Sequence, residues 1–269
     1  MKLKHFDSLS SKTIFKLTGV FFLIDIVLSF NLWFKIYRET PYISIIRLHD
    51  INYFSVALSI VFTVSIIIGL IKYNYFYVLT SLITLILLLL FDRMKWQPWV
   101  YIYTIALTLC TVEKIFKEKD VLFLIKFVLA TVYFWAGIHK FSPSYTAGMQ
   151  NFSYIFLNNM FLFKAIPFIE VAMGILLFFG PITKVLKNVY IIFHCFIIVF
   201  ILIVGKVYDV IIPWNIYMIC LIELLYRKEK SKSNTNYLKS TKVKIIIAIF
   251  FVLPILNFYN KLDHYLSFS

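Results

Sequence analysis

The stretch TVYFWAGIHKFSPSY, residues Thr131–Tyr145, joins a long apolar run to two adjacent basic residues and then to a Ser-Pro-Ser turn. The basic residues are His139 and Lys140. Partial desolvation at the mouth of an apolar helix disfavours the ammonium form of a lysine, so that its amine can serve as a base. The competing interpretation is that Lys140 simply extends to the lipid headgroups, as lysines at helix ends usually do.

Composition predicts a polytopic membrane protein. Of 269 residues, 61% are hydrophobic and 15% are charged, with a mean hydropathy of +0.86, whereas a soluble domain is about half apolar and about a quarter charged. The formal net charge of +14 could suggest a nucleic-acid partner. Most of the basic residues lie between apolar runs, however, and the positive-inside rule accounts for them better. We therefore expect a lipid bilayer as partner, and no nucleic acid.

The cysteines predict neither a disulfide framework nor a metal site. Cys110, Cys195 and Cys220 all lie in apolar runs, without a CxxC or His–Cys spacing. No metal is expected. The first apolar run follows several lysines, as in a signal peptide, but no small-x-small cleavage site comes after it, which predicts an uncleaved anchor.

Apolar runs near the length of a spanning helix recur along the chain. A spanning helix needs about 20 apolar residues, and backbone groups in lipid must be bonded within the segment. The expected spans are Ile14–Phe34, Ile51–Ile71, Phe76–Phe91, Trp99–Val112, Val121–Ile138, Ala165–Gly180, Asn188–Gly205, Tyr208–Tyr226 and Ile245–Tyr259. The third, fourth and ninth are short. We predict an all-α, polytopic integral membrane bundle of eight or nine transmembrane helices, forming a single domain over residues 1–269.

Alternate connections between the spans differ in their content of Lys and Arg. The set that contains the N-terminus and the segment Arg227–Lys244 is the richer one. The positive-inside rule therefore predicts a cytoplasmic N-terminus in the cell membrane, inner or plasma, and an external C-terminus if the number of spans is odd. The basic segment 227–244 is expected to form a flexible cytoplasmic loop near anionic lipid.

Charged and aromatic residues gather between the third and fourth spans. The link FDRMKWQPWVYIY, Phe91–Tyr103, contains Asp92, Arg93, Lys95 and Trp96. By composition alone it is an interfacial aromatic belt with an Asp–Arg pair. The functional alternative is the wall of a substrate pocket.

Polar residues also interrupt the spans themselves, where they are costly in lipid and normally face the interior of a bundle. They are Asp25, Glu170, His194, Asp209 and Asn215. Glu170 lies in the outer half of its span, where it could pair with Lys140 or His139. His194 lies in the inner half of its own helix. For each of them, a hydrogen bond to a neighbouring helix is an equally good interpretation.

The segment VYFWAGIHKFSPSY resembles a motif of the vitamin K-dependent γ-carboxylase family, whose bacterial membrane part is known as the horizontally transferred transmembrane domain. The family carries an Ala-Gly-x-basic-Lys-hydrophobic signature, in which the second basic residue is the proposed catalytic lysine. Lys140 matches this position, and His139 matches the one before it. The resemblance continues through EVAMGILLFFG (Glu170–Gly180) and FHCFIIVFILIVG (Phe193–Gly205), and covers roughly residues 92–225.

This resemblance implies a reduced quinone, of the menaquinone or vitamin K type, as cofactor. In the family a lysine deprotonates the quinol, which reacts with oxygen, and the strong base so formed removes a glutamate γ-proton before carbon dioxide is added. Lys140 and His139 would be catalytic. The residues expected to support them or to line the substrate pocket are Asp92, Arg93, Lys95, Trp96, Glu170 and His194.

The chain departs from the family at two points. Lys95 stands near the place where animal enzymes have a histidine, and the large extramembrane domain that engages protein substrates is not expected here. A small peptide, or the quinone alone, is therefore an easier substrate to imagine than a large protein. Two alternatives stay open: a DoxX-like or methylamine-utilisation membrane protein linked to quinone or thiol redox, and a non-enzymatic interaction or immunity protein.

Overall fold

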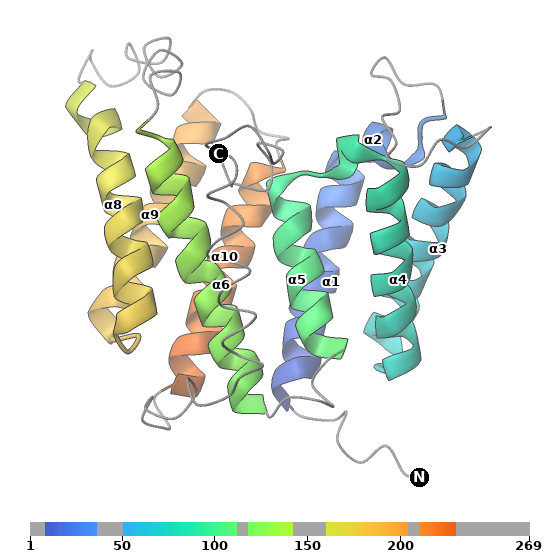
Figure 1. The fold of residues 1–269 in the computed structure, drawn as a ribbon, viewed down its shortest axis with the longest axis horizontal. Coiled ribbons are helices and arrows are strands. Elements are labelled where there is room, and N and C mark those ends of the chain that lie inside the picture. Colours follow the sequence, from blue (N-terminus) through green and yellow to red (C-terminus); the bar gives the residue numbers. More distant parts are fainter. Residues whose placement is uncertain (1–8, 37–50, 112–117, 142–159, 204–209, 230–269) are drawn as a thin grey trace. The chain divides into compact units, whose positions relative to one another are not determined.

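The computed structural model describes residues 9–36, 51–111, 118–141, 160–203 and 210–229. Within these ranges the chain forms helices and no strand, which confirms the predicted all-α class (Figure 1). The chain divides into two compact units. Unit 1 is Met1–Val121 with His194–Leu221, and unit 2 is Leu122–Phe193 with Ile222–Ser269.

Most of unit 1 is a group of helices from the first part of the chain. They are α1 (Leu9–Leu28), α2 (Phe30–Phe34), α3 (Ile51–Ile71), α4 (Tyr75–Phe91) and α5 (Pro98–Thr111), with a turn of 3-10 helix, η1 (Arg93–Lys95), between α4 and α5. α3 packs most extensively on α4, and α1 packs on α5 (Figure 1). The core between α1, α3 and α5 is aromatic: the ring of Phe22 lies 4.8 Å from that of Phe62 and 5.0 Å from that of Tyr103.

Unit 2 is organised around α6 (Glu118–His139). α8 (Met160–Phe179) packs against it, and α9 (Lys184–Ile203) and α10 (Ile211–Glu229) each run through both units. From Leu124 to Tyr133 every residue of α6 is buried. α6 is therefore the central helix of this unit.

The expected spans up to Tyr226 coincide with helices, although several bounds move by a few residues. The first span differs, because α1 ends at Leu28 and the short helix α2 follows. Ser29 lies at this break, and its hydroxyl donates a hydrogen bond to the carbonyl oxygen of Asp25 at 2.5 Å. A serine hydroxyl that bonds the backbone in this way competes with the regular helical pattern. The expected span Ile245–Tyr259 and the basic loop beyond residue 229 lie outside the described residues.

Among the described helices, three are long and apolar enough to cross a membrane: Asn52–Ile71, Val121–His139 and Lys184–Ile203. This is fewer than the eight or nine that the sequence predicts. α4 and α5 are apolar but have only 17 and 14 residues, which gives lengths of about 26 and 21 Å. The hydrocarbon core of a bilayer is about 30 Å thick, so each falls short of a perpendicular crossing.

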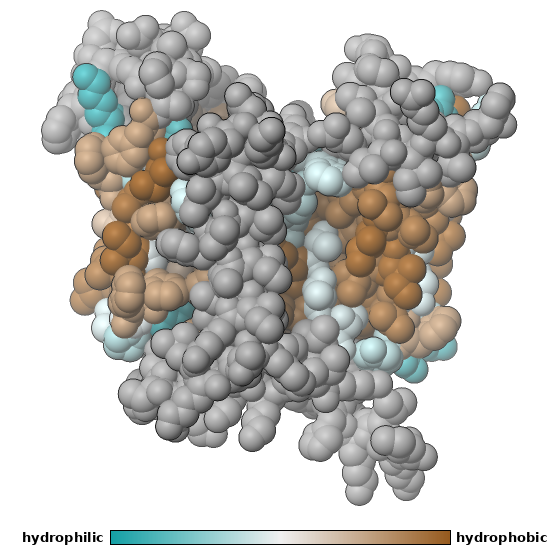
Figure 2. Space-filling view, viewed as in Figure 1, coloured by the Kyte–Doolittle hydropathy of each residue, from teal (hydrophilic) through white to brown (hydrophobic). Residues whose placement is uncertain are grey.

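Apolar side chains cover the outer faces of several helices. Figure 2 shows such a surface over α3 and α4. On α3 the exposed residues include Phe54, Val61, Val64, Ile67 and Ile71, and on α9 they include Val185, Val189, Ile192, Phe196, Val199 and Ile203. The spacing of three and four places on α9 puts its residues on a single face. Exposed apolar faces of this extent are typical of surfaces that meet lipid or another protein.

Candidate functional site

An ion pair joins Lys140, at the end of α6, to Glu170 in α8. The amine nitrogen Nζ of Lys140 lies 2.7 Å from Oε1 and 2.6 Å from Oε2 of Glu170. The Glu170 side chain is only 7% exposed, and that of Lys140 is 26% exposed. Of the two partners that the sequence allowed for Glu170, Lys140 and His139, the structure brings Lys140 to it, and the pair is open to its surroundings on the lysine side.

Close contact between the backbones of α6 and α8 explains how these two side chains meet. A Cβ atom added to Gly137 would lie 2.6 Å from the carbonyl oxygen of Pro167 and 2.8 Å from the backbone nitrogen of Val171. Real Cβ atoms do not approach backbone atoms so closely, so this position requires glycine. Gly137 precedes Lys140 by three places, which puts both on the side of α6 that faces α8.

Gly174 makes the reciprocal contact from α8. A Cβ atom there would lie 2.6 Å from the backbone nitrogen of Phe134 and 2.8 Å from the carbonyl oxygen of Ala130. Gly174 follows Glu170 by four places and so lies on the same face of α8. Small residues that let two helices approach are common in membrane helix pairs. The two glycines thus hold the helices at the separation that the ion pair needs.

Replacing Gly174 with alanine is expected to destabilise the protein by about 1–3 kcal/mol, because the added methyl group overpacks the α6–α8 contact. Thermal unfolding of the protein in detergent would measure the loss. Gly19→Ala is the matched control, since the nearest atom to a Cβ there is the flexible end of Leu70, at 3.1 Å. Equal stability of the two variants would contradict the close contact.

Aromatic rings surround the end of α6. Phe141 and Phe168, which are both exposed, meet edge to face with their centroids 4.8 Å apart. His139 is buried, and its ring lies 5.9 Å from that of Trp135. His139 is next to Lys140 in sequence, but successive residues of a helix point in different directions. Its role beside the pair stays a prediction.

Tyr133 is a neighbour of the pair that the sequence analysis did not select. Its buried side chain lies within electrostatic range of Glu170, and its ring centroid is 5.0 Å from that of Tyr190. The number of residues that separate Tyr133 from Lys140 in the sequence could have identified it. Tyr133, Gly137 and Lys140 are separated by four and three places, the spacing of one helix face.

Lys126 is a second residue that the sequence analysis did not select. It is buried within α6, and its Nζ donates a hydrogen bond of 2.7 Å to the carbonyl oxygen of Gly180, just beyond the end of α8. The last carbonyl groups of a helix lack partners within the helix, and a cation there also meets the negative end of the helix dipole. The lysine thus fixes the end of α8 against α6.

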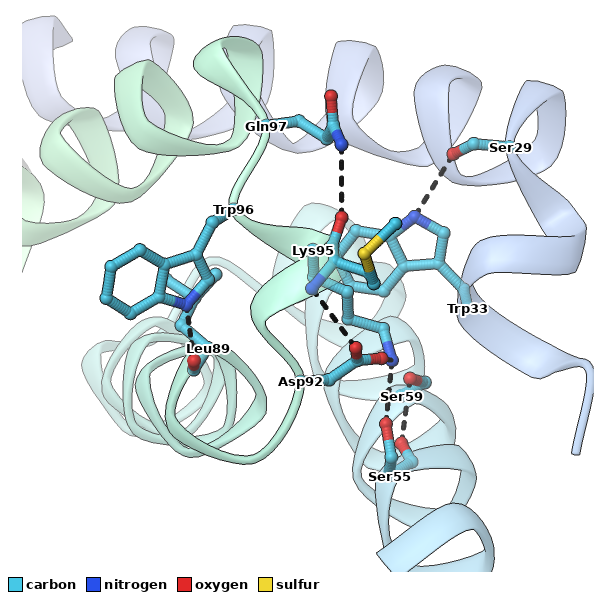
Figure 3. A network of polar contacts seen from close by, with 10 residues as sticks. Ser29, Trp33, Ser55, Ser59, Leu89, Asp92, Lys95, Trp96 and Gln97 are labelled. Atoms are coloured by element: carbon cyan, nitrogen blue, oxygen red, sulfur yellow. Dashed lines mark hydrogen bonds and ion pairs between the residues drawn. The ribbon is translucent and has the colours of Figure 1, made fainter. Parts of the chain in front are cut away.

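In unit 1, Asp92 and Lys95 form an ion pair that is entirely buried (Figure 3). Nζ of Lys95 lies 2.9 Å from Oδ2 of Asp92, donates a hydrogen bond of 2.7 Å to the hydroxyl of Ser55, and lies 5.4 Å from the centre of the Trp33 ring. Both charged side chains are 0% exposed. This burial favours a structural clamp over the predicted substrate pocket, because no substrate reaches either charge from solvent in this conformation.

Trp96 fixes the same link from its other side. Its indole N–H donates a hydrogen bond to the carbonyl oxygen of Leu89 near the end of α4 (Figure 3). Arg93 lies in η1, and its side chain is outside the described part of the structure. Trp96 therefore anchors the connection between α4 and α5.

His194 bonds to a neighbouring helix. Its Nδ1 lies 2.6 Å from the side-chain oxygen of Asn215 in α10, and the amide nitrogen of Asn215 donates to the carbonyl oxygen of Ile211 at 2.7 Å. This is the hydrogen bond to a neighbouring helix that the structural interpretation of these two polar residues expects. His194 belongs to unit 1, whereas Lys140 and Glu170 belong to unit 2.

Among the residues that the structure describes, no three His, Cys, Asp or Glu side chains are grouped so that they could hold a metal ion. Comparisons of the chain with protein-family models, with curated proteins and with solved structures found no match. The geometry of the Lys140–Glu170 pair is therefore the main basis for a functional proposal.

Proposed function

We propose that the protein is an integral enzyme of the cell membrane, that it acts on a reduced quinone, and that Lys140 and Glu170 form its acid–base pair. The observation that carries the proposal is the two-oxygen contact between the buried Glu170 carboxylate and the Lys140 amine at the end of an apolar helix. Ionisable groups held in such surroundings are frequent in active sites.

The pair can accept a proton from a substrate because the Lys140 amine and the Glu170 carboxylate share a single proton between them. In the ion pair, the proton is on Lys140 and the carboxylate of Glu170 is charged. Transfer of that proton along the 2.6–2.7 Å contact leaves a neutral amine and a neutral carboxyl. The neutral amine can then take a proton from a substrate hydroxyl, which restores the lysine ammonium.

The apolar outer faces of α3 and α9 support a position in the membrane. An apolar face that contacts lipid needs no polar residues around it, because the lipid interior holds no water. The distribution of Lys and Arg supports a cytoplasmic N-terminus. With this orientation and the spans expected from the sequence, Lys140 would lie at the outer surface of the membrane. The complete bundle of eight or nine spans remains part of the proposal.

Two exposed aromatic side chains lie close to Lys140 and Glu170 in the sequence and contact each other, and they would suit a flat apolar ring that carries hydroxyl groups. Phe141 follows Lys140 directly and Phe168 precedes Glu170 by two places, and both present exposed aromatic surface. Aromatic side chains with a few polar groups nearby are the usual lining of sites for such ligands. When bound, a reduced quinone would supply electrons to oxygen. Lys140 and Glu170 would hold its hydroxyl, and the two phenylalanines would support its ring.

The resemblance of the Ala136–Phe141 segment to the γ-carboxylase signature favours carboxylation of a glutamyl side chain as the coupled reaction. Oxidation of the quinol alone is the simpler variant on the same site. A small peptide is the proposed second substrate in the first case, and none is needed in the second.

The test uses the full-length protein in detergent with a reduced naphthoquinone, radiolabelled bicarbonate and a glutamyl peptide. Oxygen uptake and incorporation of label are followed for wild type, for Lys140→Ala and for Lys187→Ala. Lys187 is the matched control, because it pairs with Glu223 at 3.0 Å in the same unit but outside the proposed site. We expect uptake that is lost only in Lys140→Ala.

The pattern of results separates the proposals. Uptake with incorporated label indicates a carboxylase, and uptake without label indicates quinol oxidation. If the protein neither binds the naphthoquinone nor takes up oxygen, the enzyme proposal is wrong, and an interaction protein becomes the better account.

A further inference from the structure

A second set of buried polar side chains lies in unit 1, outside the Asp92–Lys95 clamp. The hydroxyl of Tyr103 in α5 donates a hydrogen bond of 2.7 Å to Oδ2 of Asp25 in α1. Thr18 also lies in α1, seven places before Asp25 and on the same face. Its hydroxyl lies 3.0 Å from that of Tyr217 in α10. The rings of the two tyrosines meet edge to face at 4.7 Å. All four side chains are completely buried.

The second oxygen of the Asp25 carboxyl, Oδ1, has no hydrogen-bond partner among the described residues. An ionised carboxylate needs donors for both of its oxygens when it is removed from water, and it is very costly without them. Asp25 also lies in the last turn of α1, which ends at Leu28. The carbonyl groups of a last turn are the negative end of the helix, so they further disfavour a negative charge there.

Among the described residues, the elements of unit 1 that pack against α1 place no positive charge beside Asp25, and the part of α10 that belongs to unit 1, up to Leu221, contains no Lys, Arg or His. α2, α3 and α5 contain no Lys, Arg or His. The titratable side chains that face this region are Tyr103 and Tyr217, with Cys110 and Cys220 next to Tyr217. The buried lysine of η1 is already paired with the aspartate of its own turn. Nothing in the described part of unit 1 thus balances an ionised Asp25.

We propose that Asp25 is a proton-binding site in the interior of unit 1, where its carboxyl holds a proton on Oδ1 and releases it when the local structure admits water. Oδ2 is then the carbonyl oxygen that accepts the hydrogen bond from Tyr103. Release breaks the bond between Oδ1 and hydrogen, passes the proton to water and leaves the carboxylate with the Tyr103 hydroxyl as its donor. This site is independent of the Lys140–Glu170 pair.

Infrared spectroscopy tests this directly, because a protonated carboxyl has a carbonyl stretching band that a carboxylate lacks. We expect the difference spectrum between wild type and Asp25→Asn, recorded at neutral pH in detergent, to show one such band. In Tyr103→Phe the band should move to higher frequency, because its carbonyl oxygen loses a hydrogen bond. Glu223→Gln is the control, since Glu223 is partly exposed and paired with Lys187 and Arg227, so no band should be lost.

Three results would overturn the proposal. The first is a difference spectrum without the band at neutral and at acidic pH, which would mean that Asp25 stays ionised. The second is a band that persists unchanged to the alkaline limit of the folded protein, which would mean that the proton is never released. The third is failure of Asp25→Asn to fold while Glu223→Gln folds, which would mean that the negative charge is required.

Discussion

Replacing Lys95 with methionine is expected to lower the free energy of unfolding by about 3–5 kcal/mol, because Asp92 is then left as a buried charge without its partner. Both side chains are 0% exposed, and the lysine also bonds to Ser55 in α3. Denaturant unfolding in mixed detergent micelles, followed by circular dichroism, would measure the change.

The partly exposed pair of Lys187 and Glu223 supplies the control for this prediction. Lys187→Met should change the free energy of unfolding by less than about 1 kcal/mol, since pairs that water can reach contribute little. The double variant Asp92→Asn with Lys95→Met should recover much of the loss, because no unpaired charge remains. A loss in Lys95→Met as small as that in Lys187→Met would contradict the structural clamp.

Removing either partner of the Lys140–Glu170 pair is expected to lower the rate of quinol oxidation by about 10²- to 10⁴-fold, the usual contribution of a general acid or base. The informative comparison includes Lys140→Ala, Glu170→Gln and the double variant. Because groups that act as a unit have strongly non-additive effects, the double variant should be no slower than the slower single variant. Steady-state oxygen uptake would measure all three.

If the rate of the double variant fell by the product of the two single reductions, the result would contradict a shared acid–base pair and would indicate two independent roles. Quinone affinity, measured by fluorescence quenching of the protein's tryptophans, serves as the control. We expect it to change less than the rate, because the aromatic residues that would support the ring are untouched.

Most of the described helices could be predicted from the sequence, because long apolar runs favour helices. The break at Ser29 between α1 and α2 could not, since the apolar run continues through it. The pairing of Lys140 with Glu170 was also within reach, since both were expected at the outer ends of neighbouring spans. The contribution of Gly174 was not, because it depends on the separation of two backbones that lie far apart in sequence. A glycine within an apolar run gives no sign of which helix approaches it.

Asp92 and Lys95 show a different limit. Charges at the end of an apolar run normally lie at the membrane surface, which is why the sequence favoured an interfacial belt. The structure buries both, and the contact that makes this favourable comes from Ser55, 40 residues earlier in the chain. Lys126 is similar, because its partner is a backbone carbonyl group 54 residues away, and no side-chain pattern marks a carbonyl group as an acceptor.

The most direct test of the proposed acid–base pair is the rate of quinol oxidation by Lys140→Arg. An arginine keeps the positive charge and can hold both oxygens of the Glu170 carboxylate, but it does not lose its proton under ordinary conditions. We predict that this variant folds and binds the quinone as wild type does, yet oxidises it as slowly as Lys140→Ala. Oxidation at the wild-type rate would show that position 140 needs only a positive charge, and that the lysine is not the base.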